Sequence, residues 1–279
     1  MKQTNLLLGC LEVEPGISLK YQYHIQEAAH ETLVFIHAHS ADQRMWEPQI
    51  NHFTSRYSVL TYDLRGYGES SLPFEGKHFL HAADLRVLLD QLHIDTAHII
   101  GLSLGSFVTL DFWSMYPDRV RSVTVASGAI PDPKPDDPPP RVIDLPRFKQ
   151  EWFARLQEGC GEDRNGYQDR LWTMIADWTG WQRTHDEPDC ILGEGVLNKL
   201  GAIQNPGPVC IINGGKDFKG AHHSANRLLQ CMPHAVTVFL SEAGHFSNME
   251  TPDEFNVALG IFLNKGGSHH DSKSDLARL

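Results

Sequence analysis

Short runs of β-branched and other apolar residues alternate with longer amphipathic stretches along most of the chain. This alternation is typical of βαβ units, so it predicts a mostly parallel central sheet flanked by helices. The first 30 residues carry a Pro-Gly turn between two partly alternating segments, which predicts a hairpin at one edge of the sheet. The predicted strands of the parallel part are residues 32–37, 58–63, 97–102, 120–126, 208–213 and 235–240, and predicted helices include 82–92, 107–116 and 253–263.

One long interval, residues 131–204, breaks the alternation. It has no strand pattern and opens with the sequence PDPKPDDPPP, which we expect to be an extended connector because proline fixes φ and lacks a backbone donor. Helical patterns follow this connector. The interval therefore looks inserted into an α/β core made of residues 1–130 and 205–265, and polar residues 266–279 are expected to form a flexible C-terminal tail.

The composition of the chain limits which classes of binding partner and which cellular compartment we expect. The net charge is −11 and no basic stripe offsets it, which disfavours nucleic acid and anionic membrane surfaces as partners. No apolar run approaches the roughly 18 residues of a membrane helix, and the leucine run near the start is shorter than the about 7 residues that a signal peptide needs. The five scattered cysteines fit reduced thiols. We expect a cytoplasmic protein, with homo-oligomerisation left open.

The sequence HIIGLSLGSF boxes Ser103 between Gly101 and Gly105 at the junction of a predicted strand and a predicted helix. This G-x-S-x-G context is that of a nucleophile elbow, in which a sharp turn lifts the serine hydroxyl above the sheet. The two glycines leave room for the strained turn, and the helix N-terminus favours developing negative charge. Ser103 is therefore the candidate nucleophile.

Several motifs together resemble the α/β-hydrolase family, across nearly all of residues 1–265. Besides GLSLG they are YDLRGYGES at 62–70, YPDRV at 116–120 and GHFSNMETP at 244–252. The sequence around MWEPQI is similar to the 3-oxoadipate enol-lactonase branch and to general carboxylesterases. The resemblance implies an α/β-hydrolase fold in which residues 131–204 form a helical cap over the catalytic residues. Asp63 and Arg65 in the second motif are interpreted as structural braces.

A serine hydroxyl needs a base, and that base needs an acid to orient it. His245 follows the strand at 235–240 and matches the histidine of the family motif, so it is the candidate base. Asp217 follows the strand at 208–213 and gives the order Ser, Asp, His that is expected of this fold. Asp132, after an earlier strand, remains the alternative acid.

The strand end FIHAHSADQ departs from the family pattern, which has His-Gly where this chain has His37 and Ala38. By position, the resemblance implies that the backbone N–H groups of His39 and Leu104 form the oxyanion hole. Alanine tolerates positive φ poorly, which leaves the path of this loop open. A metallohydrolase with His37, His39 and Asp42 as ligands is the rival interpretation, but the spacing does not match a known run of metal ligands.

The aromatic residues of the inserted interval predict an apolar pocket with few charges. The pocket candidates are Ser40, Trp152, Trp172 and Phe246. We therefore expect a serine hydrolase that cleaves a carboxylic ester or lactone of a small, largely apolar substrate through a seryl acyl-enzyme, with no cofactor and no metal. Carbon–carbon bond hydrolysis and perhydrolysis on the same triad remain alternatives, and a non-catalytic small-molecule receptor is a further one.

Overall fold

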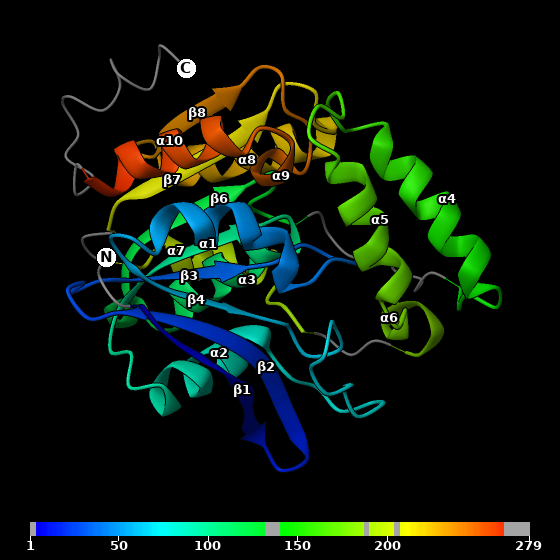
Figure 1. Ribbon diagram of the computed structural model, residues 1–279, viewed down its shortest axis with the longest axis horizontal. Coiled ribbons are helices and arrows are strands. Elements are labelled where there is room, and N and C mark those ends of the chain that lie inside the picture. The colour runs from blue at the N-terminus through cyan, green and yellow to red at the C-terminus, as the bar shows by residue number, and fades with distance from the viewer. Residues whose placement is uncertain (1–3, 132–139, 187–189, 204–206, 265–279) are drawn as a thin grey trace.

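A central eight-stranded sheet organises the computed structural model of the protein, which describes residues 4–131, 140–186, 190–203 and 207–264 (Figure 1). The strand order is β1-β2-β4-β3-β5-β6-β7-β8. The α/β fold and the strands expected from the sequence are confirmed. The strands are β1 (Thr4–Glu14), β2 (Ile17–Gln26), β3 (Thr32–Ile36), β4 (Ser58–Tyr62), β5 (Ala97–Leu102), β6 (Val120–Ala126), β7 (Val209–Gly214) and β8 (Val236–Leu240).

The sheet has a hairpin edge and a parallel body. The expected hairpin joins β1 to β2, and β2 also pairs antiparallel with β4. From β4 to β8 every neighbouring pair is parallel. Strands β3, β4 and β5 are buried along their whole length, as parallel strands covered on both faces are. This burial explains why they read as continuous apolar runs in the sequence.

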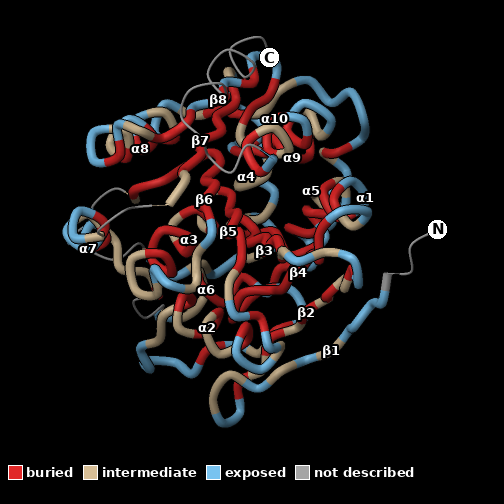
Figure 2. Tube along the Cα trace, turned by 90° about the vertical axis from the view of Figure 1, so that its left-hand side faces the viewer, coloured by how far each residue is buried: buried red, intermediate tan, exposed pale blue. Residues whose placement is uncertain are grey.

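Helices cover both faces of the sheet, and Figure 2 shows the buried strands enclosed between them. On one face, Leu33 and Phe35 of β3 pack with residues of α1 and α10. On the other face, Val34 and Ile36 pack with α2 and α3. The helices of the core are η1 (Gln43–Trp46), α1 (Glu47–Phe53), α2 (His81–Gln91), α3 (Leu104–Met115), η2 (Pro117–Arg119), α8 (Lys219–Cys231), α9 (Ser247–Glu250) and α10 (Pro252–Asn264).

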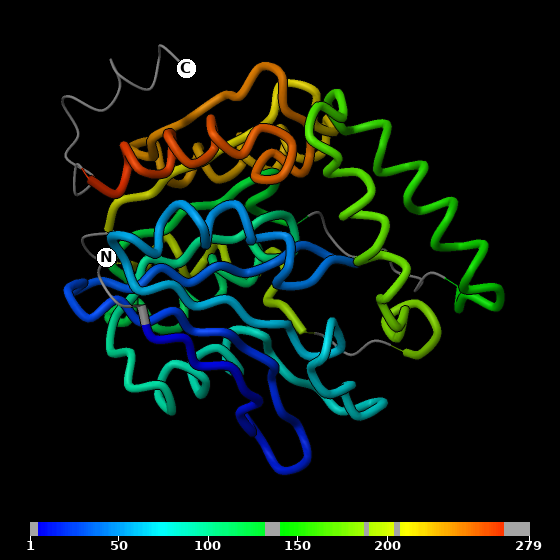
Figure 3. Tube along the Cα trace, in the orientation of Figure 1, coloured from blue at the N-terminus to red at the C-terminus, as the bar shows by residue number. Residues whose placement is uncertain are grey.

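The chain leaves the sheet after β6 and returns at β7, and Figure 3 traces this excursion beyond the ends of the parallel strands. Within the described residues of the excursion there is no strand, as expected. Its helices are α4 (Leu145–Gln157), α5 (Tyr167–Asp177), α6 (Trp181–Thr184) and α7 (Gly195–Leu200). The first three lie beside the carboxyl ends of the strands, whereas Val196 and Leu200 of α7 pack with residues of α3.

Two expectations fall outside the described residues: the proline-rich connector and the C-terminal tail. No helix in the part of the chain that the structure describes is both long and apolar enough to cross a membrane.

Candidate active site

Ser103 lies at the junction of β5 and α3, in the turn that the sequence predicts. Its φ is 55° and its ψ is −114°, a conformation that residues other than glycine rarely adopt. The turn is held by its backbone, since Ser103 N–H donates to the carbonyl of Ala126 at 2.9 Å. Strain of this kind persists where the surrounding structure imposes it, and it commonly marks functional residues.

The glycines on either side are required by close backbone contacts. A Cβ on Gly101 would lie 2.0 Å from the carbonyl oxygen of Gly105, and one on Gly105 would lie 2.1 Å from the carbonyl oxygen of Ile36. The first turn of α3 therefore packs directly on β5 and β3. The Ser106 hydroxyl reinforces this packing by hydrogen bonding to the carbonyls of Gly101 and Ala126 at 2.9 and 2.8 Å.

His245 and Asp217 come together from the loops that follow β8 and β7. The Nδ1 atom of His245 lies 2.7 Å from Oδ1 of Asp217, whose side chain is fully buried. That oxygen also accepts the N–H of Phe218 at 2.6 Å. A carboxylate bonded to Nδ1 fixes the orientation of the imidazole and leaves Nε2 for other chemistry.

A second carboxylate, Glu250, organises the histidine loop, which is the stretch from Gly244 to Phe246 around His245. It accepts the N–H groups of Gly244 at 2.7 Å, Phe246 at 2.8 Å and Gly161 at 2.5 Å, and the last belongs to the inserted interval. Burial raises the pKa of Glu250, while the three N–H donors act in the opposite direction. His245 N–H in turn donates to the carbonyl of Gly159 at 2.7 Å. Sequence reasoning passed over Glu250, although it is the glutamate of the GHFSNMETP motif.

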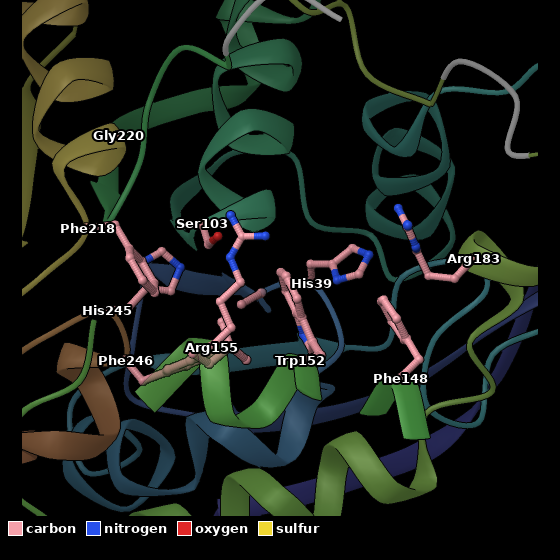
Figure 4. Close-up of a pocket in the computed structure, with 12 residues that line it drawn as sticks. His39, Ser103, Phe148, Trp152, Arg155, Arg183, Phe218, Gly220, His245 and Phe246 are labelled. Carbon is pink, nitrogen blue, oxygen red and sulfur yellow. The ribbon is translucent and has the colours of Figure 1, made fainter. Parts of the chain in front are cut away.

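Ser103 and His245 open into one cavity of about 580 Å³ between the strand ends and the inserted helices (Figure 4). Among the described residues, Ser103 Oγ has no hydrogen bond to His245. The two groups nevertheless share a chamber that a substrate carbonyl can enter. The cavity is lined by Ala38, His39, Ser103, Phe148, Trp152, Arg155, Leu156, Arg183, Phe218, Gly220, His245 and Phe246.

The loop after β3 accommodates Ala38 without strain, because the positive φ falls on Ser40 at 58°. In the described part of the chain, the backbone N–H groups of His39 and Leu104 have no hydrogen-bond acceptor. His39 itself lines the cavity, so its N–H belongs to a loop at the cavity wall. Burial, then the positive charge of Arg183 and then His37, lower the pKa of His39 to about 4, so its ring is neutral at neutral pH.

The structure does not assemble the rival metal site. Nδ1 of His37 lies 2.8 Å from the carbonyl oxygen of Ala38, and its Nε2 accepts the N–H of Leu64 at 2.9 Å. Asp42 caps η1 and forms an ion pair with Arg44 at 2.7 Å. Because both nitrogens of His37 and the carboxylate of Asp42 are already engaged, these residues do not form a ligand set.

The four pocket candidates have different positions. Trp152 and Phe246 line the cavity. Ser40 is fully buried behind it, where its hydroxyl accepts the Nε1–H of Trp152 at 2.8 Å. Trp172 is not among the residues that line this cavity, and its ring packs against Phe153, with centroids 5.3 Å apart.

The sequence predicts an apolar pocket with few charges. The cavity wall does carry charge, since Arg155 of α4 and Arg183 of α6 both line it. Asp63 is a brace as expected, accepting the N–H groups of Gln43 and Glu69, and Arg65 forms ion pairs with Asp84 and Glu14. The alternative acid Asp132 lies outside the described residues.

Comparisons with known proteins agree with this fold. The chain is 34% identical over 114 residues to 3-oxoadipate enol-lactonase 1 of Acinetobacter baylyi, covering 41% of this chain and 42% of that protein. It is 26% identical to 3-oxoadipate enol-lactonase 2 of the same species, covering 86% and 91%. A crystal structure of a putative aryl esterase from Burkholderia cenocepacia superposes with a TM-score of 0.75 at 21% identity, covering 93% and 99%. Residues 33–258 match the alpha/beta hydrolase family, so the chain belongs to that family.

Proposed function

We propose that this hydrolytic enzyme cleaves a carboxylic ester or lactone through a seryl acyl-enzyme. The observation that carries the proposal is the strained Ser103 elbow, which opens into the same cavity as a histidine bonded to a buried aspartate. The family membership and the enol-lactonase relatives support the reaction class.

In the first half-reaction, Ser103 Oγ attacks the carbonyl carbon while His245 Nε2 takes the hydroxyl proton. Asp217 stabilises the imidazolium through Nδ1–H. The N–H groups of His39 and Leu104 hold the oxyanion of the tetrahedral intermediate. When that intermediate collapses, the carbon–oxygen bond to the leaving alcohol breaks and the alcohol takes the proton from His245.

In the second half-reaction, water attacks the acyl carbon while His245 takes a proton from it. The bond between the acyl carbon and Ser103 Oγ then breaks, Oγ takes the proton back from His245, and the acid is released. A lactone follows the same steps, except that the leaving hydroxyl stays attached to the acyl group. The inserted helices act as a cap in this scheme, because Trp152 and Leu156 of α4 line the same cavity as Ser103. A mostly apolar wall excludes water and favours a substrate with an apolar body.

The proposal is tested with a fluorophosphonate reagent, which forms a covalent bond only with an activated serine. We expect the wild-type protein to be labelled at Ser103, with loss of hydrolysis of simple methyl and p-nitrophenyl esters. Ser103→Ala should be neither labelled nor active, and Ser114→Ala serves as the control, because that serine lies on the same helix and its hydroxyl donates to the carbonyl of Asp111. Labelling that persists in Ser103→Ala, or ester hydrolysis that EDTA abolishes and the reagent does not, would contradict the proposal.

A further inference from the structure

Two arginines in the wall of the cavity differ from all the others in the described residues. Each of those others donates from its guanidinium to a carboxylate, an amide oxygen, a hydroxyl or a backbone carbonyl. Within the same described ranges, the guanidinium groups of Arg155 and Arg183 have neither a hydrogen bond nor an ion pair. Both of these unpaired cations face the chamber that contains Ser103.

Arg183 is the more constrained of the two. Its guanidinium carbon lies 5.2 Å from the centroid of the Phe148 ring, so the charged group is supported by an aromatic face. Its Nε is buried and has no acceptor in the described structure. A buried donor without an acceptor costs free energy, and a planar guanidinium fits a carboxylate through two parallel hydrogen bonds. Arg155, in contrast, is exposed to solvent.

The charge of Arg183 acts inside the cavity. It is the second cause, after burial, of the lowered pKa of His39. His39 is therefore neutral and does not compete with Arg183 for an anion. The chain as a whole carries a net charge of −11, so this positive wall contrasts with the rest of the molecule. Local positive charge in a cleft concentrates anionic ligands there.

We infer that Arg183 binds a free carboxylate of the substrate, and that the preferred substrate is a half-ester of a dicarboxylic acid or a lactone that carries a separate carboxylate. The inference rests on the proposed function. Figure 4 shows Arg183 on the far side of His39 and Trp152 from Ser103, so the free carboxylate lies at the end of the substrate remote from the scissile carbonyl. Arg155 contributes less, because water competes for an exposed guanidinium.

The test compares the monomethyl and dimethyl esters of glutaric, adipic and pimelic acids, with acid release followed by pH-stat. For the wild-type protein we expect kcat/KM of the best monoester to exceed that of its diester by at least about tenfold, as a charge-assisted hydrogen bond implies. Arg183→Met should lower kcat/KM for that monoester by roughly 10- to 100-fold. The same variant should leave the diester within about threefold, and free glutarate should cease to inhibit it competitively.

Matched variants separate the outcomes. Arg155→Met should have a smaller effect, and Arg147→Met, an arginine of the same helix α4 that does not line the cavity, should have none. Equal loss on monoester and diester in Arg183→Met, or a wild-type enzyme that prefers diesters, would overturn the inference while leaving the proposed function intact. Absence of fluorophosphonate labelling and of hydrolysis of every ester would instead overturn the proposed function.

Discussion

The two sides of the cavity are built in different ways. The floor consists of the turns at the strand ends, with Ser103 and His245, and its geometry is set by backbone contacts such as the approach of Gly105 to Ile36. The roof consists of α4 and α6 side chains such as Trp152 and Arg183. These side chains are held by ring–ring and cation–π contacts. In the proposed reaction, backbone contacts hold the reacting groups of the floor in place, whereas side chains of the roof select the substrate. Substitutions in the floor should therefore lower stability or turnover strongly, and those in the roof should mainly alter substrate binding, with small effects on stability.

The largest loss of stability is expected at Gly105, where the floor has no room for a side chain. In Gly105→Ala, the new Cβ would meet the Ile36 carbonyl oxygen at 2.1 Å, so the backbone must shift. We expect a loss of about 3 kcal/mol or more in the free energy of unfolding, together with loss of activity. The matched control is Gly220→Ala, because Gly220 also lines the cavity and has nothing within 4 Å of its Cβ position. Urea unfolding of both variants is the measurement, and equal stabilities would contradict the contrast.

The next effect concerns the buried acid of the floor. Asp217→Asn keeps the shape of the side chain but removes the charge that stabilises the His245 imidazolium. We expect kcat to fall by at least about 10², equivalent to about 2.7 kcal/mol, with KM and folding nearly unchanged. Asp132→Asn is the control and should be nearly silent. If steady-state kinetics gave the reverse ranking, the acid would belong to the loop after β6.

A pH dependence should arise where the inserted segment is bonded to helix α3 of the core. Asp111 of α3 accepts the N–H of Leu192 at 2.8 Å, and burial raises the pKa of its carboxyl from 3.8 to about 7. The folded state therefore holds this proton more tightly than the unfolded state, and the free energy of unfolding should decrease as the pH rises from about 4 to about 7.

The matched variant is Asp111→Asn, which retains an acceptor for Leu192 but does not titrate. Its difference in unfolding free energy between pH 4.5 and pH 7.5 should be smaller than that of the wild type by on the order of 2 kcal/mol. Urea unfolding at the two pH values measures this difference. Parallel pH profiles for the two proteins would show that Asp111 does not titrate in this range.

The smallest loss of stability is expected at the hydrogen bond between Trp152 of the roof and Ser40 of the floor. Trp152→Phe removes the Nε1–H donation to Ser40 Oγ, while Ser40 still donates to the carbonyl of His39 at 2.6 Å. We expect a loss of about 1 kcal/mol in stability and a modest rise in KM. A double-mutant cycle with Ser40→Ala isolates the contact, and a coupling energy near zero would mean that the roof is held by packing alone.

The difference between floor and roof also explains how much the sequence could predict. Strands and the Ser103 elbow were predictable, because their signals are local: apolar runs of strand length and glycines at fixed positions. Asp217 and His245 follow two neighbouring parallel strands, whose carboxyl ends lie at the same edge of the sheet. Their proximity therefore followed from the topology. Glu250 was within reach of the same reasoning, as a glutamate at a fixed spacing from His245.

The side chains of the roof were less predictable, because the sequence pattern indicates where a helix forms but not which of its faces packs against the core. In α5, Leu171, Met174 and Ile175 are buried, and this places Trp172 against Phe153 and away from the cavity. Arg155 and Arg183 look like ordinary surface residues in the sequence, and only the docked helices place them in the wall. Ala38 has no positive φ, whereas Ser40 has one, and this distribution depends on the path of the whole loop.

The attachment of the inserted segment to the histidine loop has a consequence for redesign of the enzyme. Gly159 and Gly161 bond to His245 and to Glu250, and a Cβ on Gly244 would lie 2.2 Å from the carbonyl oxygen of Gly159. An inserted segment transplanted from a relative must therefore reproduce this short stretch, or His245, the proposed general base, loses its support. Replacement of the inserted segment at its α6 end is not limited in this way by the histidine loop. Libraries that aim at new substrates are best confined to Phe148 and Arg183, where the wall can change while the reacting groups stay in place.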